Sequence, residues 1–367
     1  MKISIIGTRG LPAFYGGFET FAEEISPLFV KAGHEVYVQC DYSDSEIPNL
    51  KGVQLFYSPV TKSKNPLRYY CYGIRKALKF SDIIIVTGSP GSLFYFLNLF
   101  RRKIILTNTD GIESKRAKWS VFQKAILKLS ERIAVRNSDY ILADSLSIKD
   151  YLKKTYRINE QRIKVIEYGA HINTGFSNDV LTRRNLKYQE YYLVVCRLEP
   201  ENNIHMIIDG YITSKSNAQL VIVGRITNKR YVRNLLKKYR SDKVIFPGDI
   251  YDHSELNSLR FASKAYIHGH SIGGTNPSLL EAMGNGNIVI CHDNPFNREV
   301  TDNKQLYFSD NKECAQRIVE VENMSSDQMI LFRNNSLSRI KDYYNWNNIL
   351  EKYLELFRLL TEKKKFN

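Results

Sequence analysis

The chain has 367 residues, 43% of them hydrophobic and 25% charged, which excludes a disordered or fibrous protein and suits two globular domains. Five scattered cysteines without a Cys-x-x-Cys pair exclude a disulfide framework or zinc ribbon and indicate a reducing compartment. The longest apolar stretch, residues 92–100, is about half the ~20 residues that a membrane-spanning helix needs. The net charge of +15 indicates anionic partners.

Short β-branched segments alternate with helical patterns from the first residue. In the first half the predicted strands are residues 2–6, 35–39, 53–57, 83–87, 104–107, 140–143 and 163–166. In the second half they are residues 191–195, 219–223, 244–246, 265–268 and 288–290. Such alternation is typical of a parallel sheet covered by helices on both faces. The sequence therefore predicts an α/β protein with two doubly wound halves.

A polar stretch rich in glycine and asparagine, residues 167–179, separates the two series of strands. We expect a first domain over residues 1–172, a linker over 173–188 and a second domain over 189–345. Residues 346–367 form a separate C-terminal helix in this scheme.

The first predicted strand leads into a glycine-rich loop that carries Gly16 and Gly17 before a helix. Backbone N–H groups in such a loop can approach an anion at the helix N-terminus. The glycine spacing differs from the Gly-x-Gly-x-x-Gly of a dinucleotide-binding fold, which argues against a nicotinamide site. The alternative is a turn that merely needs positive φ angles.

Two charged residues follow predicted strands directly. Asp110 comes after strand 104–107, and Arg197 comes after strand 191–195. Ligands of open α/β sheets bind beyond the carboxyl ends of the strands. Asp110 is therefore a catalytic candidate, and the planar guanidinium of Arg197 is a candidate for holding a diphosphate. An ordinary Asp-Gly turn and a surface arginine are the alternatives.

The strongest signal surrounds a Gly-Gly-Thr-Asn-Pro run in the second half. Asn276 is predicted to cap a helix that begins at Pro277, so that Gly274 and Thr275 lie at the positive end of the helix dipole. Glu281 follows about one helical turn later, where its carboxylate can accept hydrogen bonds from sugar hydroxyls. This order suits a site for an anion and a polyol.

Other catalytic motifs are missing from the sequence. It has no Asp-x-Asp after a predicted strand, no P-loop and no Gly-x-Ser-x-Gly, which disfavours a metal-dependent nucleotide-sugar site, a nucleoside triphosphatase and an α/β-hydrolase. His268 and His270 lack metal-ligand spacing and are interpreted as structural histidines, with a ligand or catalytic role as the alternative.

Together these segments resemble the GT-B glycosyltransferases, specifically retaining family 4 and its rhamnosyltransferase-like subgroup of bacterial polysaccharide assembly. The resemblance rests on Gly-Thr-Arg-Gly-Leu-Pro at 7–12, Tyr-Gly-Gly-Phe-Glu-Thr at 15–20, Asp-Gly-Ile-Glu at 110–113 and Gly-Gly-Thr-Asn-Pro-Ser-Leu-Leu-Glu-Ala-Met at 273–283. It implies a GT-B architecture, in which two Rossmann-like domains face each other across a cleft. Tyr-Asn-Trp at 344–346 resembles the start of a terminal helix that crosses back to the N-terminal, acceptor-binding domain.

By this resemblance, Gly16 and Gly17 approach the diphosphate of a nucleotide-sugar donor, and Arg197 holds it. The family commonly has a lysine five residues after this arginine, where this chain has Asn202. One positive partner of the diphosphate is therefore missing at the position of Asn202.

The resemblance also places the transferring sugar and the nucleotide. Asp110 lies beside the sugar, with Glu19 and His268 as alternative catalytic candidates. Glu281 takes the ribose, and the backbone around Asp249 and Ile250 meets the base. Where the family commonly has a first glutamate, this chain has glycine, so recognition of the donor sugar falls to the three residues Gly274, Thr275 and Asn276.

Residues 62–136 hold 16 basic and 4 acidic residues, a net charge of +12. Two helical patterns in this segment, residues 67–80 and 114–136, place basic residues opposite an apolar face that we expect in the core. In the second helix that apolar face comprises Trp119, Phe122, Ile126, Leu129 and Ile133. The charge predicts docking on an anionic membrane surface. Nucleic acid is the alternative partner, but no nucleic-acid-binding motif is present.

We therefore expect a cytoplasmic glycosyltransferase, peripheral on the inner face of the cell membrane, that transfers a hexose, with L-rhamnose preferred. The donor is a dTDP- or UDP-linked sugar and the acceptor is a saccharide on a lipid diphosphate. No metal and no separate cofactor is expected. A nucleotide-sugar 2-epimerase on the same fold and a basic nucleic-acid-binding protein are the alternatives.

Overall fold

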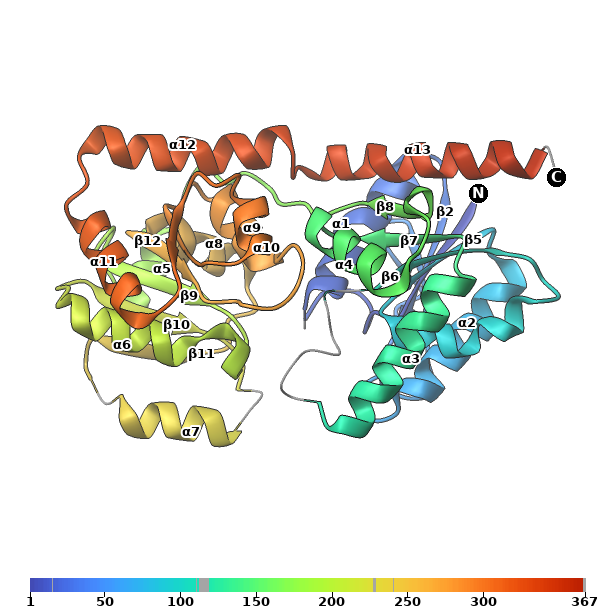
Figure 1. The fold of residues 1–367 in the computed structure, drawn as a ribbon, viewed down its shortest axis with the longest axis horizontal. Helices are drawn as coiled ribbons and strands as arrows, with labels where there is room; N and C mark the ends of the chain where they lie inside the picture. Colours follow the sequence, from blue (N-terminus) through green and yellow to red (C-terminus); the bar gives the residue numbers. More distant parts are fainter. Residues whose placement is uncertain (15, 110, 112–118, 227–228, 240, 366–367) are drawn as a thin grey trace. The chain divides into compact units, whose positions relative to one another are not determined.

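The computed structural model describes residues 1–14, 16–109, 111, 119–226, 229–239 and 241–365. The chain forms two compact units, of which unit 1 comprises Met1–Tyr168 with Trp346–Asn367 and unit 2 comprises Gly169–Asn345 (Figure 1). The stretch 173–188, expected as a linker, lies in unit 2. It contains the helix α5 (Asn178–Arg183), which packs against α8 (His253–Ala262).

Unit 1 is built on a sheet whose order, over the described residues, is β3-β4-β2-β1-β5-β6-β7-β8. Its strands are β1 (Lys2–Ile6), β2 (Glu35–Cys40), β3 (Asn49–Leu50), β4 (Val53–Tyr57), β5 (Ile83–Thr87), β6 (Ile104–Asn108), β7 (Tyr140–Ala143) and β8 (Ile163–Val165). All neighbours pair in parallel except β3 with β4. Every residue of β5 and β6 is buried, because helices cover both faces at the centre of the sheet.

The helices of unit 1 are α1 (Gly17–Lys31), α2 (Pro66–Phe80), η1 (Ser89–Asn98), α3 (Val121–Asn137), α4 (Leu146–Tyr156), η3 (Glu160–Arg162) and α13 (Trp346–Lys365). The C-terminal α13 packs against α1 near the start of the chain. The rings of Tyr353 and Phe357 lie 5.4 and 5.3 Å from the ring of Phe29. Unit 1 therefore joins the two ends of the sequence.

Helix α3 buries a different face from the one expected. Its buried residues are Ser130, Glu131, Ala134 and Val135. Phe122 is 74% exposed and Leu129 is 54% exposed, so the prediction that they lie in the core is wrong. The segment η1 packs against both α2 and α3, and Phe100, which follows η1, is 96% exposed.

Unit 2 is built on a fully parallel sheet of order β11-β10-β9-β12-β13-β14 over the described residues. Its strands are β9 (Tyr191–Val195), β10 (Gln219–Val223), β11 (Val244–Gly248), β12 (Ala265–His268), β13 (Val289–His292) and β14 (Leu306–Phe308). Strand β14 was not predicted, because its three residues fall below the length of a recognisable apolar run.

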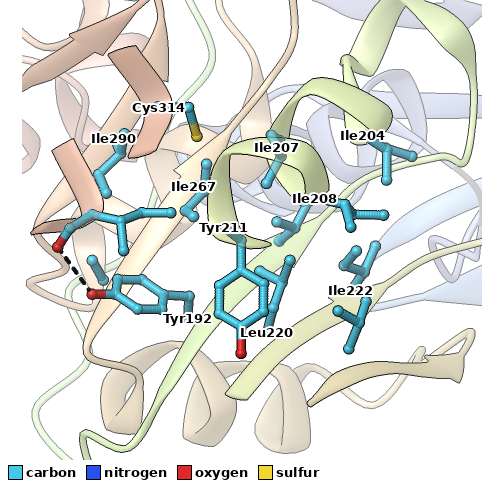
Figure 2. Packing of buried hydrophobic residues seen from close by; sticks show 14 of the residues in the cluster. Tyr192, Ile204, Ile207, Ile208, Tyr211, Leu220, Ile222, Ile267, Ile290 and Cys314 are labelled. Carbon is cyan, nitrogen blue, oxygen red and sulfur yellow. Dashed lines mark hydrogen bonds between the residues drawn. The ribbon is translucent and has the colours of Figure 1, made fainter. Parts of the chain in front are cut away.

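The remaining helices of unit 2 are η4 (Pro200–Asn202), α6 (Ile204–Ser214), α7 (Lys229–Lys238), α9 (Pro277–Gly284), α10 (Pro295–Val300), α11 (Asn311–Glu322) and α12 (Ser326–Asp342). Figure 2 shows the core, in which Ile207 and Ile208 of α6 pack over the apolar residues of the sheet. The hydroxyl of Tyr192 donates to the carbonyl of Ile318 at 3.3 Å, so this buried polar group is satisfied.

The two doubly wound, Rossmann-like α/β halves expected from the sequence are confirmed. Among the described residues, no helix combines the length and apolar character needed to cross a bilayer.

Candidate functional site

In unit 2 the chain runs outward from β9 through β10 to β11, and then crosses back to the other side of β9, where β12, β13 and β14 follow, so the strand order reverses between β9 and β12. Ligands of such sheets bind at this reversal, beyond the carboxyl ends of the strands. Arg197 follows β9, and His268 ends β12. Both predicted site residues therefore lie at the binding edge of the sheet.

The guanidinium of Arg197 is about one-third exposed. Its nearest acid is the buried Glu199, whose Oε2 lies 3.8 Å from Nη2 of Arg197, beyond hydrogen-bond distance. The arginine fork therefore keeps donors for a ligand at this edge.

Asn202 ties two loops of this edge together. Its Nδ2 donates to the carbonyl of Arg197 at 2.6 Å, and its Oδ1 lies 2.8 Å from Nδ1 of His270. Because Nδ2 faces a carbonyl, Oδ1 must accept from His270, so the Nδ1 atom of His270 carries the proton. The side chain of Asn202 thus makes protein contacts in this structure. From the sequence, we expected only that Asn202 lacks the positive charge of the lysine common in the family.

The loop between β12 and α9 has the predicted helix cap. The Oδ1 of Asn276 accepts from the backbone N–H of Ser278 at 3.0 Å, and Pro277 is the first residue of α9. Gly273 has a φ of 142°, and a Cβ there would lie 2.9 Å from Nε2 of His270. Gly274 and the buried Thr275 follow at the positive end of the helix dipole.

Glu281 lies in α9 with a side chain that is one-quarter exposed, and its Oε2 accepts from Nη2 of Arg260. Arg260, on α8, is 1% exposed. Its Nη1 lies 3.4 Å from Oδ1 of Asn257. Sequence reasoning missed Arg260. Arg260 follows Leu256 by one helical turn, on the side of α8 that faces the core. This spacing in the sequence could have indicated that Arg260 is buried.

His268 is 3% exposed, and its ring stacks on the ring of Tyr266 at a centroid distance of 6.0 Å. Burial lowers the pKa of His268 to about 3, and the neighbouring His292 acts in the same direction. The imidazole is therefore neutral near pH 7, so His268 is not in the imidazolium form that a general acid needs. This environment agrees with the structural interpretation of His268, to which catalysis was the alternative.

Strands β9, β10 and β11 end close together. A Cβ on Gly224 would lie 1.7 Å from the carbonyl oxygen of Cys196, so only glycine fits there. The N–H of Gly224 donates to the carbonyl of Gly248, which precedes the two residues assigned to the base. Asp249 is exposed and accepts from the hydroxyl of Tyr251 at 2.8 Å, whereas Ile250 is buried. These residues lie at the same sheet edge as Arg197.

In unit 1, α1 begins at Gly17, and Gly16 is its N-cap without a side-chain hydrogen bond. Glu19 is 4% exposed, and its Oε1 accepts from the backbone N–H of Arg9 at 2.8 Å. The carboxylate of Glu19 therefore holds the glycine-rich loop in shape. The Nζ of Lys62 donates to the carbonyl of Gly7 in the same loop.

Asp110, the first catalytic candidate, lies outside the described residues, as do residues 112 and 113 of the Asp-Gly-Ile-Glu motif. The residue before it, Thr109, is 3% exposed and follows the buried strand β6 at the binding edge of unit 1. The described residues contain no group of three or more histidine, cysteine, aspartate or glutamate side chains placed to hold a metal ion.

Two family models match the chain. Residues 1–171 match a domain of unknown function, DUF1972, and residues 182–336 match glycosyl transferases group 1. Residues 182–336 are thus similar to group 1 glycosyltransferases, and the chain has the fold of that group. The match covers most of unit 2, including every site residue described there.

Similar proteins span nearly the whole chain. The O-antigen chain mannosyltransferase of Salmonella typhimurium is 24% identical over 330 residues, covering 87% of this chain and 86% of that protein. HepE of Anabaena, solved in complex with UDP-glucose, has a TM-score of 0.79 at 17% identity and covers 98% and 99% of the two chains. Sucrose-phosphate synthase of Thermosynechococcus elongatus has a TM-score of 0.81 at 16% identity and covers 99% of each chain. The two solved structures share the fold of both units of this chain.

Proposed function

We propose that this glycosyltransferase moves a hexosyl group from a nucleoside-diphosphate sugar to a saccharide on a lipid diphosphate, in the synthesis of a cell-surface polysaccharide. The observation that carries the proposal lies in unit 2. Arg197, the capped N-terminus of α9 and the carboxylate of Glu281 share one sheet edge in a domain that is similar to group 1 glycosyltransferases. The relative named for O-antigen synthesis supports the polysaccharide context.

In this proposal the donor binds at the carboxyl edge of the sheet in unit 2. The guanidinium of Arg197 and the backbone of Gly274 and Thr275 stabilise the diphosphate, whose leaving-group charge grows in the transition state. Glu281 accepts from the ribose hydroxyls. Because the dipole of α9 and one arginine supply positive charge, transfer needs no metal ion.

The reaction proposed is retaining, as in the family 4 enzymes that the sequence resembles. Asp110 stabilises positive charge on the sugar in the transition state. The same resemblance assigns Gly16 and Gly17, at the start of α1, to the donor diphosphate. We propose L-rhamnose as the transferred sugar. Mannose should be tested as well, because the Salmonella relative is named as a mannosyltransferase.

A donor panel tests the proposal. The purified chain is incubated with dTDP-rhamnose, GDP-mannose, UDP-glucose and other nucleotide sugars, with and without lipid-linked oligosaccharides, and both products are followed by mass spectrometry. We expect release of the nucleoside diphosphate together with an acceptor that is one hexose heavier. An isomerised donor formed without acceptor would instead identify an epimerase. No turnover of any donor would contradict the proposal.

We also propose that unit 1 docks on the cytoplasmic face of the membrane. The exposed apolar residues Phe122 and Leu129 lie on α3 among basic residues such as Lys128. Apolar side chains can enter the interface while lysines and arginines meet anionic headgroups, each worth about 1 kcal/mol. Phe100, which follows η1, is another exposed apolar residue of unit 1.

A further inference from the structure

A cavity of about 310 Å³, open to solvent, lies in unit 1, and none of its lining residues belongs to the glycine-rich loop. Its lining residues are Arg132, Val135, Arg136, Thr155, Tyr156 and Arg157. They come from the C-terminal parts of α3 and α4. This volume is at the lower end of the roughly 300–1,000 Å³ of small-ligand sites. Three of the six lining residues are arginines and none is acidic.

The acids near this cavity already have partners. Both carboxylate oxygens of Glu160 pair with lysines of α4, Lys149 and Lys153. The carboxylate of Glu131 accepts from the hydroxyls of Tyr156, at 2.8 Å, and Tyr151, at 3.3 Å. Among the described residues, no acid forms an ion pair with the arginines of the cavity, and all three arginines are exposed, so their guanidinium groups can reach a ligand.

Helix C-termini favour basic residues, and this preference explains one arginine at the end of each helix. It does not explain why three arginines line the same cavity. Arg162 already donates to the carbonyls of Arg136 and Ser138 at the end of α3. Arg132 lies one turn before that end, and Arg157 adopts a left-handed conformation with φ 50° beside the cavity.

We infer that this cavity binds a phosphate group. Guanidinium groups match the geometry of phosphate oxygens, and three of them suit a tetrahedral anion better than a planar carboxylate. Thr155 adds a hydroxyl group to the lining, whereas the hydroxyl proton of Tyr156 is already donated to Glu131. Arg132 and Arg136 lie three and seven residues after the exposed Leu129, on the same face of α3. A phosphate carried by a lipid would therefore sit beside the apolar surface of unit 1.

Paired substitutions in the full chain test the inference. Arg132→Gln with Arg157→Gln removes two charges from the cavity, and Lys124→Gln with Lys128→Gln removes two charges from α3 outside its lining. Binding is measured by calorimetry with two probes, inorganic phosphate and monomeric dihexanoyl phosphatidylglycerol. We expect saturable binding, weakened roughly tenfold or more by the arginine pair and less than threefold by the lysine pair.

The two probes separate the sources of the phosphate. Binding of the lipid probe assigns the cavity to a headgroup, and binding of inorganic phosphate alone assigns it to a soluble phosphate. Equal weakening by the two pairs, or no saturable binding of either probe, would overturn the inference. Thermal melting of both variants checks that they are folded. The test measures binding at unit 1 alone, so its result does not depend on sugar transfer.

Discussion

Arg260 and Glu281 form an ion pair between α8 and α9, in which the arginine is fully buried and the glutamate remains one-quarter exposed. Burying a guanidinium is costly unless a partner satisfies it. The pair holds one carboxylate oxygen of Glu281 in place and leaves the other for a ligand. Arg260 is thus a positioning residue for the glutamate that we assign to the ribose.

Arg260→Met should weaken nucleotide binding as much as Glu281→Gln does. The double variant should bind no worse than either single variant, because both changes disable the same carboxylate. Glu281→Gln should also lower the free energy of unfolding by about 3–5 kcal/mol, because it leaves the buried guanidinium of Arg260 without its carboxylate partner. Titration calorimetry with UDP and chemical denaturation measure the two effects.

Arg184→Met provides a matched control, since Arg184 pairs with Glu255 of the same helix α8. This variant should retain nucleotide affinity. If Arg260→Met and Arg184→Met bind nucleotide equally well, Arg260 has no positioning role.

Arg197→Ala should weaken binding of a nucleoside diphosphate by about one to two decades, the value of a lost charge-assisted contact of roughly 1.5–3 kcal/mol. Binding of the nucleoside without phosphates should not change. Calorimetry with UDP and uridine measures both. Lys264→Ala, before the amino end of β12, serves as a control of equal charge. A parallel loss of uridine affinity would contradict the assignment to the diphosphate.

Acid should destabilise the fold through His268. Burial lowers the pKa of His268 to about 3 in the folded state, whereas the unfolded chain binds this proton near pH 6.5. Between those values the unfolded state holds more protons, so stability falls as pH falls, by up to about 1.4 kcal/mol per pH unit. His292, whose pKa burial also lowers, adds to the same trend.

His268→Gln should therefore flatten the decline in unfolding free energy between pH 6.5 and 4. Urea denaturation at several pH values measures the slope. An unchanged slope would mean that His268 is solvated in the native protein.

Replacing Phe122 and Leu129 by serine should reduce binding to anionic vesicles tenfold or more, because burying one such side chain contributes about 1.5–3 kcal/mol. The contribution of these two apolar side chains to vesicle binding should persist at high salt, whereas the contribution of the basic residues should be screened. Co-sedimentation at two ionic strengths measures both parts. Serine at Ile330 and Leu331, which are exposed on α12 of unit 2, is the control. Equal losses in the two double variants would contradict docking through α3.

Asp110→Asn should lower turnover by roughly two or more decades while donor affinity barely changes, because the carboxylate acts on charge that develops in the transition state. Single-turnover kinetics and calorimetry separate the two quantities. Near-normal turnover of this variant would contradict a catalytic role of Asp110.

Sequence patterns predicted most of the fold, because buried parallel strands are continuous β-branched runs and few other structures are compatible with them. They failed on α3. Its sequence has apolar residues on more than one side, and periodicity cannot tell which side the sheet covers. The structure buries Ala134 and Val135 and leaves Phe122 and Leu129 in solvent.

At the site, the helix cap at Asn276 could be predicted because its cause is local, within three residues. The contacts of Asn202 and Arg260 could not. Asn202 meets His270, which is 68 residues away in the sequence, and Arg260 meets Glu281 on another helix. Such pairings arise only when the strands bring distant loops to one edge.

The return of α13 to unit 1 affects the order in which the chain can fold during synthesis. Domains generally fold as the ribosome completes them, and unit 2 is complete at Asn345. Unit 1 can complete its folding only after Tyr353 and Phe357 have left the ribosome, although its first 168 residues are made much earlier. Until then Phe29 of α1 lacks the rings that cover it. A nascent chain halted before α13 would carry a finished glycosyltransferase domain beside an exposed apolar surface, the kind of intermediate that chaperones bind.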